Sequence, residues 1–175
     1  MKKFLSCAAI ALAMSMSMIS CSNDDDNNSS NQQTSSSLRI DFHTGLNAGS
    51  TIYGEGPGGA LGSKMTLGDH TQYLVGNVFA NVSINSNLSS LSGTINGFDQ
   101  NILAFTTGGM KYFYEAIDNQ VEYTITNYQE VEVVDDNVTL IKGKLTFSGY
   151  FRCVNPLNPD EVYEEAVQVS GSYDF

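Results

Sequence analysis

Apolar and polar residues alternate along the last third of the chain with the period of a β-strand. Between residues 141 and 153, the positions on one face are Ile141, Leu145, Phe147, Phe151 and Cys153. The opposite face is polar, as expected of a strand with one side in a core. After a turn-rich stretch at 154–160 the alternation returns, with one face formed by Tyr163, Val167, Val169, Tyr173 and Phe175. We therefore expect the two segments to pair as an antiparallel hairpin.

Weaker versions of the same pattern occupy the chain between residues 38 and 134. Further strands are expected at 38–43, 72–84, 91–98, 102–107, 110–116 and 121–134. After residue 37, no stretch of ten or more residues shows the 3.6-residue apolar period of a helix. The pattern predicts a single all-β, antiparallel domain of about eight strands with little or no helix. A β-sandwich and a closed β-barrel both bury alternating faces, so the pattern does not choose between them.

The start of the chain has a different character. Met1–Lys3 is positively charged, and the apolar stretch Phe4–Ile19 that follows is too short for a stable membrane span. Met18-Ile19-Ser20-Cys21 resembles the lipobox of bacterial lipoproteins, in which the cysteine is acylated on sulfur and, after cleavage, on nitrogen. We interpret residues 1–20 as a lipoprotein signal peptide and Cys21 as the lipidation site, which would anchor the mature chain to a membrane.

The residues that follow Cys21 indicate a cellular location. Ser22, Asn23, Asp24, Asp25 and Asp26 resemble the acidic export tag of Bacteroidota surface lipoproteins. The tag implies an outer-membrane, lipid-anchored protein that faces out of the cell, and a merely solvated acidic linker is the alternative. Residues 27–37 contain no apolar side chain. We expect 21–37 to be the anchor, tag and a disordered stalk, and 38–175 to be the folded domain.

A coarser resemblance covers both ends of the chain. The leader, the Cys-Ser-Asn-Asp-Asp-Asp start, and a closing pattern of alternating glycine and apolar residues are similar to those of small β-domain lipoproteins of flavobacteria. The closing pattern consists of Ile141, Gly143, Leu145 and Phe147, followed by Val169, Gly171, Tyr173 and Phe175. Because that family has no assigned catalytic residues, the resemblance implies a location and a fold class and no active site.

The charge and the cysteine content of the chain disfavour several classes of function. The chain carries 19 acidic and 8 basic residues, for a formal net charge of −11. Such a balance disfavours nucleic acid and anionic membrane surfaces as partners. With Cys7 in the leader and Cys21 acylated, Cys153 is the one remaining thiol. Its position in phase with the apolar face predicts a buried structural thiol, and a catalytic cysteine would need a nearby base.

Candidate catalytic and metal chemistry is sparse. Gly54–Gly59 contains a GxGxxG pattern, but Pro57 interrupts it and the β-like flanks do not suit a nucleotide site. Asp41 and His43 would share one face of a strand, and Asp69-His70 would have to join them to make a metal site. Available carboxylates such as Glu130 fall on polar faces, where solvation explains them. We therefore expect no enzyme activity, no metal and no cofactor.

Two functional hypotheses remain, from different classes. The first is a non-catalytic binding module whose loops, such as 54–71 and 154–160, meet an extracellular protein or glycan. The second is a lipocalin-like carrier of a small apolar ligand in a closed barrel. Its cavity would be lined by Tyr112, Tyr114, Tyr123, Phe147 and Phe151. Aromatic residues on an apolar face are more often packed core than pocket lining, which favours the binding module.

Overall fold

The computed structural model describes residues 37–55, 62–79 and 81–175. Across those ranges the chain forms ten strands and one 3-10 turn, Gly97–Asp99. The strands are β1 (Ser37–Phe42), β2 (Thr51–Glu55), β3 (Gly62–Leu67), β4 (His70–Val78), β5 (Val82–Leu88), β6 (Ser92–Thr94), β7 (Ile102–Thr107), β8 (Tyr112–Asp135), β9 (Val138–Asn155) and β10 (Asn158–Asp174). No helix long and apolar enough to cross a membrane occurs among these described residues. The expected signal peptide, Cys21 and the export tag lie outside them.

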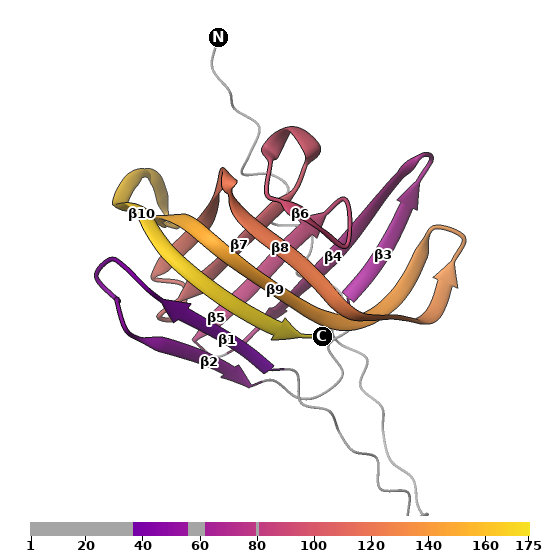
Figure 1. The fold of residues 1–175 in the computed structure, drawn as a ribbon, viewed down its shortest axis with the longest axis horizontal. Helices are drawn as coiled ribbons and strands as arrows, with labels where there is room; N and C mark the ends of the chain where they lie inside the picture. The colour runs from indigo at the N-terminus through magenta and orange to yellow at the C-terminus, as the bar shows by residue number, and fades with distance from the viewer. Residues whose placement is uncertain (1–36, 56–61, 80) are drawn as a thin grey trace, which may run out of the picture. The chain divides into compact units, whose positions relative to one another are not determined.

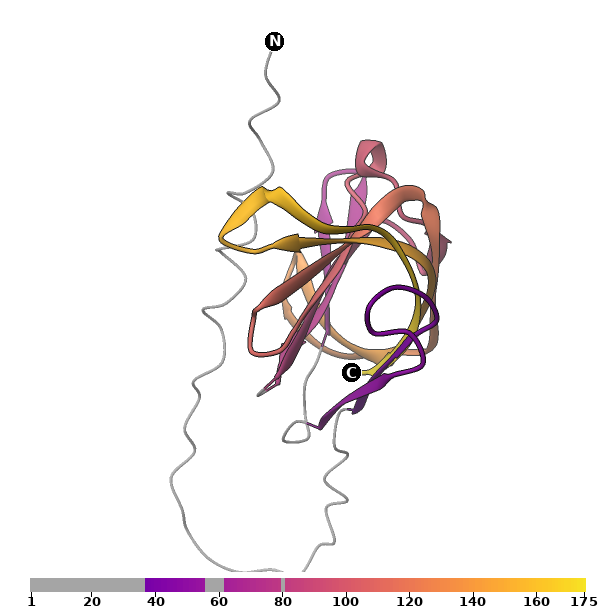
Figure 2. The same ribbon diagram turned by 90° about the vertical axis from the view of Figure 1, so that its left-hand side faces the viewer.

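The strands form one antiparallel sheet that closes on itself, which confirms the all-β fold class predicted from the alternation. The hydrogen-bonded order is β2-β1-β10-β9-β3-β4-β5-β7-β8-β6, with a further pairing between β9 and β8. Because of that pairing, the circuit from β9 through β3, β4, β5, β7 and β8 returns to β9, as in a closed barrel. Figure 1 shows the sheet from the side, and Figure 2 shows the strands curling around a common centre.

Strand β9 is the seam at which the sheet closes. One of its edges pairs with β8 from Val138 to Val154. Its other edge pairs with β10 over Lys144–Asn155 and with β3 over 138–141. The β9–β10 pairing is the antiparallel hairpin that the sequence predicts. Strands β1 and β2 continue the sheet beyond β10, and Gly54 on β2 allows close contact with Phe79.

The core consists of the residues that point into this closed sheet. On β9 the five positions predicted to face inward are all buried, which confirms the alternation there. Val167, Val169 and Tyr173 on β10, and Phe175 directly after it, are buried as predicted, but Tyr163 is 38% exposed. The strand has register shifts between Val162 and Glu164 and between Glu164 and Val167. Since such irregularities exchange the faces of a strand, Glu164 takes the place opposite Cys153 that was expected for an apolar residue.

Several predicted boundaries differ from the observed ones. Segment 72–84 contains a turn and becomes β4 and β5, while 110–116 and 121–134 join into the single long strand β8. Part of the loop expected at 54–71 is strand β3, whose pairing with β9 and β4 is antiparallel. Residues 56–61 of that expected loop lie outside the described residues. Together with β2, which no expected segment covered, these differences bring the strand number of the described part to ten.

Candidate binding site

Four of the five aromatic residues considered as cavity lining lie together in the core. Tyr114, Tyr123, Phe147 and Phe151 are each at most 3% exposed. Tyr112 lies apart from them, half-buried, with its ring packed edge-on against Tyr163 at a centroid distance of 5.6 Å. A perpendicular pair of this kind does not present one flat platform to a sugar.

Three of these buried rings pack against Phe105, a residue that the sequence analysis did not single out. Phe105 stacks on Tyr114 at 4.8 Å and lies 5.2 Å from Phe151 and 6.3 Å from Phe147. Phe42 of β1 meets the same group, 5.3 Å from Tyr114. These spacings are those of aromatic side chains in direct contact. The rings therefore pack together between β1, β7, β8 and β9.

The loop between β1 and β2 covers one end of this core with polar contacts. The Asn47 side-chain amide donates a hydrogen bond to the Tyr114 hydroxyl at 3.0 Å. The carboxylate of Glu164 accepts one from the backbone N–H of Leu46 at 2.7 Å. Burial raises the pKa of Tyr114 and also that of the Cys153 thiol, which is 1% exposed. The thiol is thus kept protonated, as suits the structural role predicted for it.

The histidines considered as metal ligands lie at separate places. Asp41 and His43 do share the outer face of β1, where Arg39 and Thr51 donate hydrogen bonds to the Asp41 carboxylate and lower its pKa. His43 pairs with the Ser170 hydroxyl at 2.8 Å. His70 is instead at the turn between β3 and β4, paired with Leu67. Within the described ranges there is no group of three His, Cys, Asp or Glu residues able to hold a metal ion.

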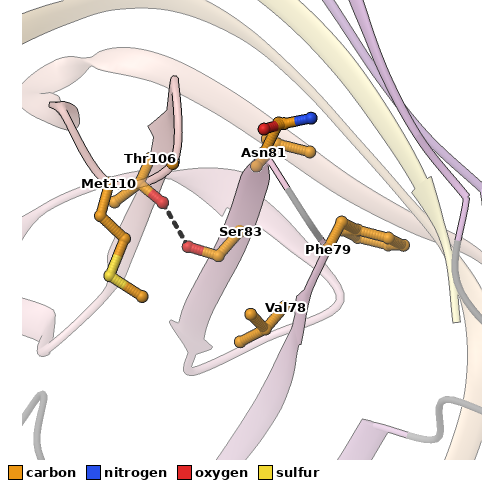
Figure 3. Close-up of a pocket in the computed structure, with 8 residues that line it drawn as sticks. Val78, Phe79, Asn81, Ser83, Thr106 and Met110 are labelled. Carbon is orange, nitrogen blue, oxygen red and sulfur yellow. Dashed lines mark hydrogen bonds between the residues drawn. The ribbon is translucent and has the colours of Figure 1, made fainter.

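A groove with a volume of about 460 Å³ lies on the outside of the sheet, between the β4–β5 and β7–β8 turns (Figure 3). It is lined by Val78, Phe79, Asn81, Val82, Ser83, Thr106, Gly109 and Met110. Antiparallel pairing places Val78, Ser83 and Thr106 side by side on three adjacent strands. Figure 3 shows the hydroxyls of Ser83 and Thr106 hydrogen-bonded to each other at the groove. The two turns are joined by a hydrogen bond from Gly109 N–H to the Asn81 carbonyl at 3.4 Å.

The groove differs from the rest of the surface in its charge. None of its eight lining residues is ionisable, although the whole chain has a net charge of −11. Two apolar residues of the lining, Val78 and Met110, are more than half exposed, and the polar Asn81 is exposed beside them. A neutral, partly apolar recess with two hydroxyls suits an uncharged side chain or ring of a binding partner.

Met110 is held in an unusual backbone conformation at the rim of this groove. Its φ is +68°, and the two preceding glycines, Gly108 and Gly109, have φ values of +64° and +66°. The left-handed region suits glycine, but for a residue with a Cβ it costs about 1 kcal/mol. The methionine side chain is 52% exposed and so recovers little of that cost through burial. Backbone strain of this kind is more frequent at binding sites than elsewhere.

The sequence analysis missed the groove, although one signal of it was present. The lining residues come from two segments, 78–83 and 106–110, that adjoin only after β5 and β7 have paired. The local signal is an apolar methionine directly after a double glycine, at a turn where asparagine or glycine would be expected. Comparisons of the chain with protein-family models, with curated proteins and with solved structures found no match.

The strain at Met110 leads to a stability prediction. We expect Met110→Gly to raise the free energy of unfolding by about 0.5–1 kcal/mol, since glycine adopts the left-handed conformation without a steric cost. Met110→Ala is the matched control, because it removes the same side chain but keeps the strain, and it should not stabilise. Urea unfolding followed by fluorescence measures both variants. A loss of stability in Met110→Gly would show instead that the methionine side chain holds the turn in place.

Proposed function

We propose that this chain is a lipid-anchored protein of the outer membrane whose β domain acts outside the cell as a non-catalytic binding module. The anchor rests on Cys21 and the residues around it, and the outward orientation rests on Ser22–Asp26. The partner is an extracellular protein or glycan, met at the surface of the domain. No nucleic acid is expected among the partners of so acidic a chain.

The observation that carries the binding role is the packing of the interior. A carrier of the lipocalin kind needs an unfilled space inside its barrel. Here the rings of Tyr114 and Phe151 both pack against the buried ring of Phe105. Phe147 also lies against Gly171, where even a Cβ would overlap its ring. Contacts this close favour recognition on the outside of the domain over carriage inside it.

The surface that best suits such recognition is the end of the domain that includes the groove. Four connections lie there, at 43–50, between β4 and β5, at 108–111 and at 156–157, as the pairings of β1, β5, β8 and β9 require. We call this the loop end, and two of its turns are at the left of Figure 1. Leu46 and Leu157 project from it almost fully exposed, in addition to Met110 beside the groove. The second of these lies in the segment 154–160 that the sequence indicated as a contact loop.

The anchor is tested by the mass of the chain purified from its host. We expect denaturing mass spectrometry to find a mature chain that begins at Cys21 and carries two or three acyl groups. The Cys21→Ser variant should lose both the acyl groups and the cleavage between residues 20 and 21. A mature wild-type chain with a different start and a free thiol at Cys21 would contradict the anchor. Digestion of the domain by protease added to intact cells reports the outward orientation.

The choice between binding module and carrier is tested by native mass spectrometry of residues 33–175 produced in the same host. We expect the measured mass to equal that of the polypeptide alone, and we expect organic extraction to recover no apolar compound. A small apolar molecule bound in a one-to-one ratio would support the carrier and exclude a filled interior. The Phe105→Ala variant is the positive control. It would contain an artificial cavity, and an apolar molecule bound in that cavity would show that the method can detect such a ligand.

A further inference from the structure

A second surface lies at the opposite end of β8 from the groove, where the strand extends beyond its neighbours. From residue 112 to residue 125, the side of β8 that faces away from β9 is covered. It pairs with β7 and β6, and the backbone N–H of Ile125 donates to the Leu91 carbonyl at 2.6 Å. From Asn127 to Asp135, β8 pairs with β9 and, among the described residues, with no strand on its other side. We call that side of residues 127–135 the distal edge.

The backbone of β8 bends repeatedly along this segment. Asn127 has a φ of +53°, and the register with β9 shifts between Thr126 and Gln129, between Glu130 and Glu132, and between Val133 and Asp135. A bend with an extra residue changes the direction of a strand at that point. The β8–β9 hairpin accordingly projects from the body of the domain on the right of Figure 1. The distal edge is therefore a bent run of nine residues, in which each register shift adds one residue to β8.

The side chains of the distal edge favour the addition of another strand. Val131, Val133 and Val134 are 48%, 70% and 57% exposed, and valine is a strong strand-forming residue. Proteins usually protect an exposed edge with proline, lysine or bulges. Residues 127–135 contain register shifts but neither proline nor lysine. The unpaired backbone groups between these shifts are thus open to a short extended peptide.

The charges of the same segment indicate which peptide would bind. Glu130, Glu132 and Asp135 lie on it, and Asp136 follows directly. Lys64 and the Tyr128 hydroxyl donate hydrogen bonds to the Glu130 carboxylate at 2.7 and 2.9 Å, whereas Glu132 has no such contact among the described residues. Lys142, opposite Gln129, is the other basic residue beside the segment. Two copies of this edge would bring like charges together, which disfavours self-pairing.

We propose that the distal edge binds an extended, lysine- or arginine-rich segment of a partner protein, which pairs with β8 as an additional strand. Backbone hydrogen bonds supply the attachment, and apolar residues of the peptide lie against the exposed valines. Its cationic side chains face the carboxylates of Glu132 and Asp135, which selects basic over acidic segments. This site is separate from the groove and does not depend on whether the groove binds anything.

The test uses the full chain, purified in detergent, and synthetic nine-residue peptides of alternating lysine and valine with blocked ends. Two further peptides carry backbone N-methyl groups on one or the other set of alternate residues, with the same charge and side chains. In strand addition, the backbone N–H groups of alternate peptide residues point toward β8, so only one of the two sets of residues donates hydrogen bonds to it. We therefore expect one N-methylated peptide to bind at least tenfold more weakly than the unmodified peptide, and the other to bind nearly as well. Fluorescence anisotropy of labelled peptides measures all three affinities.

The outcomes that would overturn the proposal are distinct. Equal binding of both N-methylated peptides would show attraction by charge alone, and no binding of the unmodified peptide would exclude the site. Glu132→Lys should weaken binding at least fivefold, whereas Asp160→Lys, an equal charge change on the loop end, should weaken it less than twofold. Equal losses in the two variants would contradict a local site. A dimer of the free chain in sedimentation, abolished by Glu132→Lys, would identify a second copy as the occupant and overturn the proposal. None of these results depends on the interior of the domain.

Discussion

The contact of Phe105 with Tyr114 and Phe151 is the interaction on which the rest of the structure depends. The three rings belong to β7, β8 and β9, which are consecutive strands of the closed circuit. Phe42 brings β1 to the same point. Each aromatic pair contributes about 0.5–1.5 kcal/mol beyond the burial of its area. The sheet closes around this group of rings. Each strand must therefore turn its apolar face toward the rings, which determines which of its residues point inward.

A filled interior has a direct consequence for function. With aromatic side chains packed at its centre, the binding proposed for the domain would use its outer surfaces, and these differ at the two ends of β8. Near Tyr112 the surface has a neutral groove bordered by a strained methionine, while near Asp135 it has an open, acidic strand edge. A tether at Cys21 would keep both surfaces near the membrane while the domain reorients. The two sites suit different partner chemistry, one uncharged and compact, the other extended and basic.

Much of the fold could be predicted from the sequence wherever one face of a strand is fully buried. On β9 every second residue from Leu145 to Cys153, apart from Gly149, is a large inward side chain, and the predicted face is correct. The prediction failed at Tyr163, because a bulge in β10 exchanges the two faces and leaves no mark in the alternation. It also failed at β3, whose residues are only partly buried and alternate weakly. That strand exists because β9 and β4 pair with it, which is a tertiary effect.

The candidate sites were harder to predict than the fold. The five aromatic residues singled out from the sequence belong mainly to the core. The sequence pattern could not show this, because an apolar face has the same alternation whether it lines a packed interior or a cavity. The groove depends on the contact of two turns distant in sequence, and the distal edge depends on where β6 and β7 end along β8. Neither is a property of a local pattern. What the sequence does contain is the valine-rich, proline-free composition of residues 127–135, which is informative once the strand is known to be an edge.

The central claim, that the interior is closely packed, is tested most directly by the unfolding free energy of Gly171→Ala. The Gly171 backbone does not lie in the left-handed region, so alanine brings no backbone strain, but its Cβ would overlap the Phe147 ring that lies opposite. In a filled core that ring has no space to enter, and the account predicts a loss of about 2–3 kcal/mol. Ser172→Ala, at the next position on the outer face of β10, should change stability by less than about 0.5 kcal/mol. A Gly171→Ala variant as stable as the wild type would mean that the ring can move into an open interior, and would contradict the account.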